Sequence, residues 1–214
     1  MKFIVFLGMP GTGKGTQCRL LYDKDGVLSL SPGEIIREKL SKDKEVSDKI
    51  NRGELLSDDF IMKLVLQQLH DLSSTDDQAL VFDGIPRTVG QAEMLQELLL
   101  NDFSTNIALV ICFVVKKRFI INRLVNRVVC ESCGAPSRAS KDFVCKVCGA
   151  KVFKKRADDD IAVIRKRLNN NKKNTDEIYN FYMQNNIKCV KLNADSNANS
   201  VYKKLKNIML STKI

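Results

Sequence analysis

The sequence predicts an α/β fold, in which a parallel five-stranded sheet is flanked by helices and carries one small insert. Short apolar runs alternate with segments of helical periodicity, and the chain of 214 residues, 44% of them hydrophobic, can bury a sizeable core. Residues 128–156 break the alternation and contain two close pairs of cysteines. We therefore expect a core domain formed by residues 1–127 and 157–214, with a separate insert at 128–156.

Five apolar runs have the length and composition of buried strands. Repeated alternation of such strands with helices is typical of a parallel sheet covered on both faces. The expected strands are Phe3–Leu7, Val27–Leu30, Ala79–Phe82, Leu109–Val115 and Cys189–Leu192.

Helices are predicted between these strands from capping residues and apolar spacing. Ser57, Asp58 and Asp59 provide an N-cap and first-turn acids before apolar residues at helical spacing, from Phe60 to Leu69. The Asn- and Lys-rich stretch 169–174 is short, which favours a polar helix face over a linker. Further helices are expected at Thr88–Leu100, Ile161–Leu168 and Val201–Met209.

The net charge of +10 is concentrated in the second half of the chain. Residues 1–115 contain 12 basic and 17 acidic side chains, and residues 116–214 contain 23 basic and 8 acidic ones. Such a field favours an anionic partner, although a solvated lysine-rich surface explains many of the lysines. No apolar stretch is long enough for a membrane helix, and the apolar N-terminus is too short for a signal peptide. We expect a cytoplasmic protein without a membrane partner.

A phosphate-binding loop, Gly8-Met9-Pro10-Gly11-Thr12-Gly13-Lys14-Gly15-Thr16, follows the first strand directly. Its glycines let successive backbone N–H groups surround an anion, the next helix offers its positive N-terminus, and Lys14 can reach the terminal phosphates. The strict signature places Ser or Thr directly after the lysine, whereas here Gly15 precedes Thr16. The motif makes the predicted fold a P-loop NTPase-type sheet, and its candidate ATP-binding residues are Gly11, Thr12, Gly13, Lys14, Gly15 and Thr16.

The insert has the ligand pattern of a structural zinc site. Cys130-x-x-Cys133 and Cys145-x-x-Cys148 are separated by eleven residues, and each pair is followed by glycine. Four thiolates in two such pairs suit tetrahedral Zn²⁺, and in an intracellular chain they indicate metal rather than disulfides.

The form Gly-x-Pro-Gly-x-Gly-Lys-Gly-Thr resembles the nucleoside monophosphate kinase family, and the rest of the chain is similar to adenylate kinases of the zinc-containing long-lid type. The resemblance implies reversible transfer of the terminal phosphoryl group of Mg-ATP to AMP, which gives two ADP. It also implies a monomer, a zinc-binding lid at 128–156 and an AMP-binding helical subdomain at 31–70. The spacer between the cysteine pairs is shorter than such lids usually have.

On the acceptor side, the segment Asp83 to Thr88 with Gln91 resembles the family's Asp-Gly-Phe-Pro-Arg-Thr-x-x-Gln. The resemblance implies that Asp83 organises Mg²⁺ through water, that Arg87 binds the monophosphate and that Gln91 bonds the adenine edge. A second motif, Leu30 to Arg37, departs from the family at Pro32 and Glu34, where Thr and Asp are usual. The AMP-binding residues implied are Pro32, Arg37, Glu54, Leu55, Leu56, Gly84, Ile85, Pro86, Arg87, Gln91, Arg156 and Arg167.

On the donor side, Arg123 and Arg127 are spaced so that both lie on one helix face. The family places the first against the ATP adenine and the second on its phosphates. Pro136 and Ser137 would supply lid backbone facing the nucleotide, and Ser196 is a loose match near the adenine. The catalytic cations implied by the resemblance are Lys14, Arg87, Arg127, Arg156 and Arg167.

Several alternatives remain open from the sequence. A kinase could use GTP as donor or a pyrimidine monophosphate as acceptor, since Pro32 removes the hydroxyl of the usual threonine. A P-loop hydrolase or switch would cleave ATP without an acceptor. A zinc-ribbon nucleic-acid binder would use the basic half, but it would leave the phosphate loop idle and has no aromatic residues among its basic ones. We therefore expect no nucleic-acid partner.

Overall fold

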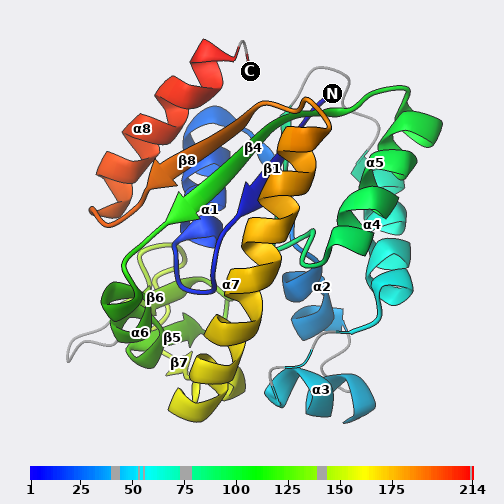
Figure 1. Ribbon diagram of the computed structural model, residues 1–214. Helices are drawn as coiled ribbons and strands as arrows, with labels where there is room; N and C mark the ends of the chain where they lie inside the picture. Colours follow the sequence, from blue (N-terminus) through cyan, green and yellow to red (C-terminus); the bar gives the residue numbers. More distant parts are fainter. Residues whose placement is uncertain (40–43, 53, 55, 73–78, 139–143, 213) are drawn as a thin grey trace.

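The computed structural model describes residues 1–39, 44–52, 54, 56–72, 79–138, 144–212 and 214. Within these residues, five parallel strands form the main sheet in the order β2-β3-β1-β4-β8. This confirms the α/β class and the parallel sheet predicted from the sequence (Figure 1). The strands are β1 (Lys2–Leu7), β2 (Leu28–Leu30), β3 (Ala79–Asp83), β4 (Ile107–Val114) and β8 (Cys189–Asn193).

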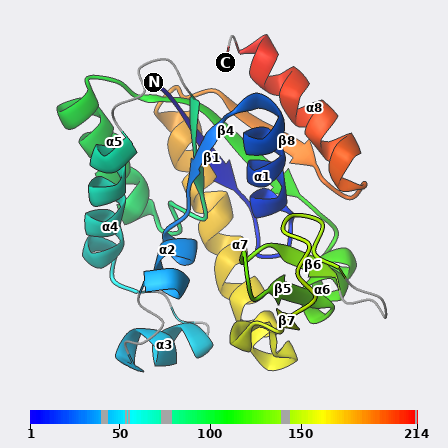
Figure 2. The ribbon, with the colours of Figure 1, turned by 180° about the vertical axis from the view of Figure 1, so that it is seen from behind.

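Both faces of the sheet are buried because helices cover each of them. Along β1, Phe3, Val5 and Leu7 point into one apolar cluster, while Ile4 and Phe6 point into the other. The first cluster packs under α4 (Asp58–Leu72), α5 (Val89–Phe103) and the end of α7 (Ile161–Gln184). The second packs under α1 (Lys14–Asp25), α6 (Lys117–Val125) and α8 (Ala198–Ser211), as the two views show (Figures 1 and 2).

The insert forms a small antiparallel sheet of its own, with strand order β6-β5-β7. Its strands are β5 (Arg127–Cys130), β6 (Pro136–Arg138) and β7 (Phe153–Lys154), which are too short to show an apolar pattern. The insert lies beyond the carboxyl ends of the main strands, on the opposite side of α7 from α2 (Pro32–Lys39) and α3 (Lys44–Asn51) (Figure 2).

The helix α7 is much longer than the predicted segment Ile161–Leu168. It runs through the Asn- and Lys-rich stretch to Gln184, which confirms that residues 169–174 are part of a helix. Asp160 caps its start by accepting a hydrogen bond from the N–H of Ala162 at 2.8 Å, and the short 3-10 turn Ala157–Asp159 precedes it. None of the described helices is long and apolar enough to cross a membrane.

Candidate active site

A cavity of about 460 Å³ opens beyond the carboxyl ends of the parallel strands, where ligands gather in open α/β sheets. It brings together residues that are far apart in the sequence, from the phosphate-binding loop to the start of α8. The predicted site residues that line it are Gly11, Thr12, Gly13, Lys14, Gly15, Thr16, Asp83, Gly84, Pro86, Arg87, Arg123, Arg127, Pro136, Ser137, Arg156, Arg167 and Ser196.

The phosphate-binding loop is held closed around its own lysine. Lys14 Nζ donates to the carbonyl oxygen of Gly8 at 2.7 Å and to that of Met9 at 3.3 Å. Thr12 Oγ1 also donates to Met9 O, at 2.8 Å. Burial lowers the pKa of the Lys14 ammonium from its usual value, and the carboxylate of Asp83 opposes that shift. The loop therefore presents a partly desolvated cation to the cavity.

Arg87 lines the same cavity as this loop. Its Nε donates to the carbonyl oxygen of Gly84 at 2.7 Å, and both residues line the cavity. Its backbone N–H donates to Oε1 of Gln91 at 2.7 Å. The guanidinium is thus attached to a backbone that other side chains hold in place.

Gln91 itself is buried, and its amide is engaged at both ends. Besides accepting from Arg87, it donates through Nε2 to Asp58 Oδ1 at 2.8 Å, and Asp58 Oδ2 accepts from Thr88 Oγ1 at 2.7 Å. The sequence motif places Gln91 beside the acceptor site, and the structure ties it to the start of α4.

Among the described residues of the expected AMP site, five do not line the cavity: Pro32, Glu54, Leu56, Ile85 and Gln91. Pro32 is buried, Ile85 belongs to the apolar core and Leu56 is half-buried. Glu54 forms ion pairs with Arg52 at 3.1 Å and with Lys166 of α7 at 3.7 Å. Leu55 and the side chain of Arg37 lie outside the described residues.

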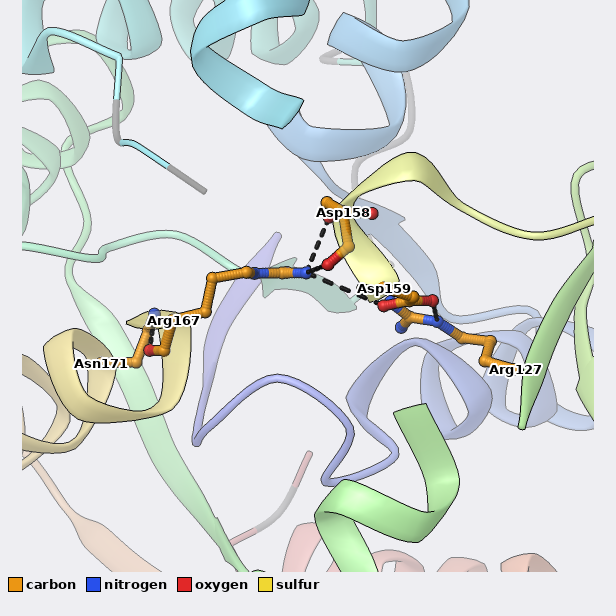
Figure 3. Close-up of polar contacts among 5 residues, drawn as sticks. All are labelled: Arg127, Asp158, Asp159, Arg167 and Asn171. Carbon is orange, nitrogen blue, oxygen red and sulfur yellow. Dashed lines mark hydrogen bonds and ion pairs between the residues drawn. The ribbon is translucent and has the colours of Figure 1, made fainter. Parts of the chain in front are cut away.

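Two arginines reach the cavity beside the aspartates that precede α7 (Figure 3). Arg127 bonds both carboxylate oxygens of Asp159, and Arg167 NH1 donates to Asp158 Oδ2 at 2.7 Å. Arg123 instead holds the loop after β8, because its NH2 donates to the carbonyl oxygen of Ala194 at 3.0 Å. The arginines are therefore ordered by protein contacts that leave further N–H donors for a ligand.

The cavity carries a strong positive charge. Among its described lining residues, basic side chains outnumber acidic ones, which are Glu34 and Asp83. Guanidinium groups bind phosphate oxygens in pairs of hydrogen bonds, so this lining suits a ligand with several phosphates. The basic residues are Lys14, Arg87, Arg123, Arg127, Arg138, Arg156 and Arg167.

The sequence predicts the polar face of α7, but not its part in the cavity. Asn171, Asn174 and Thr175 line the cavity on the same helix face as Arg167, at steps of three and four residues. The helical phase set by Arg167 could have identified them. Gln17 was also missed, although its Nε2 donates to Ala198 O at 3.0 Å and connects α1 to the start of α8.

The four cysteines of the insert lie close enough to bind one metal ion. Their sulfur atoms are all within 4.8 Å of one another, and two pairs, Cys130 with Cys148 and Cys133 with Cys145, are 3.6 Å apart. Tetrahedral zinc with bonds of about 2.3 Å needs sulfur atoms about 3.8 Å apart, so the donor set fits Zn²⁺. Backbone N–H groups of Cys148 and Val147 lower the pKa of Cys145 to about 6, while hydrogen bonds from the neighbouring cysteines raise the pKa of Cys148 to about 12, so the four thiols share protons as a group.

The parallel sheet, the phosphate-binding loop and the arginine-lined cavity together define a P-loop protein that binds phosphorylated ligands. The family model described as adenylate kinase matches residues 6–187. Curated proteins named adenylate kinase are similar along nearly the whole chain: that of Petrotoga mobilis is 33% identical over 97% of each chain. The relative from Bacillus pumilus is 32% identical over 96% of this chain and 97% of its own. The relative from Archaeoglobus fulgidus is also 32% identical, over 86% of this chain and 87% of its own. The chain belongs to the adenylate kinase family.

Proposed function

We propose that this protein transfers the terminal phosphoryl group of Mg-ATP to AMP reversibly, giving two ADP. The observation that carries the proposal is that one cavity is lined both by the phosphate-binding loop and by Arg87 of a separate motif. Arg127, Arg156 and Arg167 line the same cavity. Two phosphorylated ligands bound there would bring donor and acceptor phosphates together.

Phosphoryl transfer leaves little covalent work for the protein, so catalysis rests on alignment and on stabilisation of charge. In our proposal, Lys14 and the loop N–H groups bind the ATP phosphates, and Arg123 packs against the adenine. Arg87 binds the monophosphate of AMP. Arg127, Arg156 and Arg167 bind the oxygens of the transferred group.

Magnesium is expected with ATP, where it neutralises phosphate charge and orients the oxygens. The hydroxyl of Thr16 and the carboxylate of Asp83 line the same cavity, and such oxygen donors suit Mg²⁺ that keeps several of its waters. We propose Asp83 as a group that binds those waters.

Zinc is proposed as a structural ion that holds the insert together. Cys130, Cys133, Cys145 and Cys148 would hold it, with no open position for a substrate. The insert would then act as a stiff lid that, with residues 31–70, excludes water from the cavity during transfer. The same proposal includes a monomer acting in the cytoplasm, where these thiols stay reduced.

A nucleotide panel tests the function. The purified protein is given Mg-ATP or Mg-GTP as donor and AMP, CMP, UMP or GMP as acceptor, and diphosphate formation is measured by chromatography. We expect ATP with AMP to be the fastest pair by far. A faster reaction with CMP or UMP would assign a different acceptor, and ATP binding without phosphorylation of any acceptor would refute the kinase proposal.

A further inference from the structure

Asn174 connects the long helix α7 to the backbone of Arg87. Its Nδ2 donates to the carbonyl oxygen of Arg87 at 2.9 Å, and its side chain lines the cavity. The backbone N–H of Arg87 donates to Gln91 Oε1 at 2.7 Å. Side chains from α5 and α7 therefore hold the two backbone polar groups of Arg87.

The same helix carries Arg167, two turns before Asn174. Asn171, between them, donates from Nδ2 to the carbonyl oxygen of Arg167 at 2.7 Å. Since a helix rises about 1.5 Å per residue, Arg167 and Asn174 are separated by about 10 Å along its axis. The bond from Asn174 thus fixes Arg87 relative to a helix that also carries Arg167, the cation on the lid side of the cavity.

We propose that Asn174 is a positioning residue for the acceptor phosphate, which it serves by holding the backbone of Arg87 at a set distance from Arg167. The inference rests on the proposed function, in which both arginines bind phosphate oxygens. Hydrogen bonds to phosphate depend steeply on geometry, so a shift of the Arg87 backbone weakens acceptor binding. The hydrogen bond joins α7 to Arg87 and does not include the phosphate-binding loop, so we expect its loss to affect acceptor binding.

Two alanine variants of α7 separate this role from a general effect on the helix. Asn174→Ala removes the hydrogen bond, whereas Asn170→Ala removes the same side chain from an exposed position. Both variants gain the same helix propensity and leave the net charge unchanged. We expect Asn174→Ala to raise KM for AMP about twofold to tenfold, the usual range for loss of one hydrogen bond, with KM for ATP and the melting temperature unchanged. Asn170→Ala should match the wild type in both KM values, with a slightly higher melting temperature from the gain in helix propensity.

A third variant tests the direction of the hydrogen bond. Asn174→Asp has nearly the same shape but cannot donate when ionised, and its charge repels the phosphate. Its KM for AMP should exceed that of Asn174→Ala. An unchanged KM for AMP in Asn174→Ala, or an equal rise in both KM values, would overturn the inference. A wild type that forms no ADP from ATP and AMP would instead refute the proposed function itself, and this inference with it.

Discussion

Arg127 bonds both oxygens of Asp159, with Nε 2.7 Å from Oδ2 and NH2 2.5 Å from Oδ1. The aspartate side chain is 2% exposed and the arginine 17%, so the pair is largely shielded from water. At the neighbouring position, Arg167 NH1 donates to Asp158 Oδ2 at 2.7 Å and to the carbonyl oxygen of Asp158 at 3.1 Å (Figure 3). Arg127 and Arg167 are thus largely desolvated and oriented by the turn before α7. A phosphate can bind them without reorienting their side chains.

Asp159→Asn should destabilise the protein, because it leaves the partly buried Arg127 without its counter-charge. We expect the free energy of unfolding in urea to fall by about 1 to 3 kcal/mol, below the range for fully buried pairs. Asp160→Asn is the matched control, since asparagine caps a helix as well as aspartate does and position 160 is exposed. Equal midpoints for both variants would show that the Arg127 pair contributes no stability.

Lys14→Met should abolish most activity with little net change in stability, because the loss of its hydrogen bonds to the carbonyl oxygens of Gly8 and Met9 offsets the relief from burying a charge. The depressed pKa of Lys14 means that burial disfavours its charge in the folded state, so an apolar side chain of similar length removes that cost. Turnover should fall about a hundredfold or more, because the phosphates lose their buried cation. Lys24→Met, at the exposed end of the same helix, should keep full turnover. A fast Lys14→Met enzyme would remove the lysine from the mechanism.

Elemental analysis of the reduced protein should find one zinc ion per chain. Removing it with a chelator should lower the melting temperature by roughly 5 to 10 °C, because metal binding contributes directly to folding of the insert. Cys148→Ser should lose the zinc, whereas Cys189→Ser, which changes a thiol outside the cluster, should retain it. Metal-free protein with an unchanged melting curve would contradict the zinc site.

Two glycines of the phosphate-binding loop should respond differently to alanine. A Cβ on Gly8 would lie 2.8 Å from the carbonyl oxygen of Phe113 in β4, whereas one on Gly13 would meet nothing within 4 Å. Both residues have positive φ, so both variants carry backbone strain of about 1 kcal/mol. Gly8→Ala should lose about 1 to 3 kcal/mol more stability in urea, because of the added overlap. Equal losses would show that β4 shifts to accommodate the methyl group.

The main strands were predictable because each is a short apolar run bounded by polar or turn residues. Cys189–Leu192, for example, is expected and Cys189–Asn193 is found. The order of the strands was not predictable, since it depends on which apolar faces the helices cover. The insert strands β6 and β7 are only three and two residues long, and they pair around the cysteine cluster rather than through a pattern of their own.

Much of the cavity was predictable from motifs whose residues are adjacent in the sequence. Lys14 and Arg87 fall in such motifs, and both line the cavity. Asn174 lies in a run of asparagines and lysines, where residue type alone does not distinguish it from Asn170. The two asparagines are distinguished only by their positions around the helix α7, which place Asn174 beside Arg87.

The central position of β1 also sets an order of assembly during synthesis. This strand precedes the other described strands in the chain, yet its neighbours are β3, which ends at Asp83, and β4, which ends at Val114. One edge of the strand that leads into the phosphate-binding loop is therefore unpaired until β3 has been translated, and the other edge until β4 has, when more than half of the chain exists. Such long-range pairing slows folding and leaves apolar edges open to aggregation. The nascent protein is most vulnerable before β4 emerges, when the lid and its thiols have not yet been made.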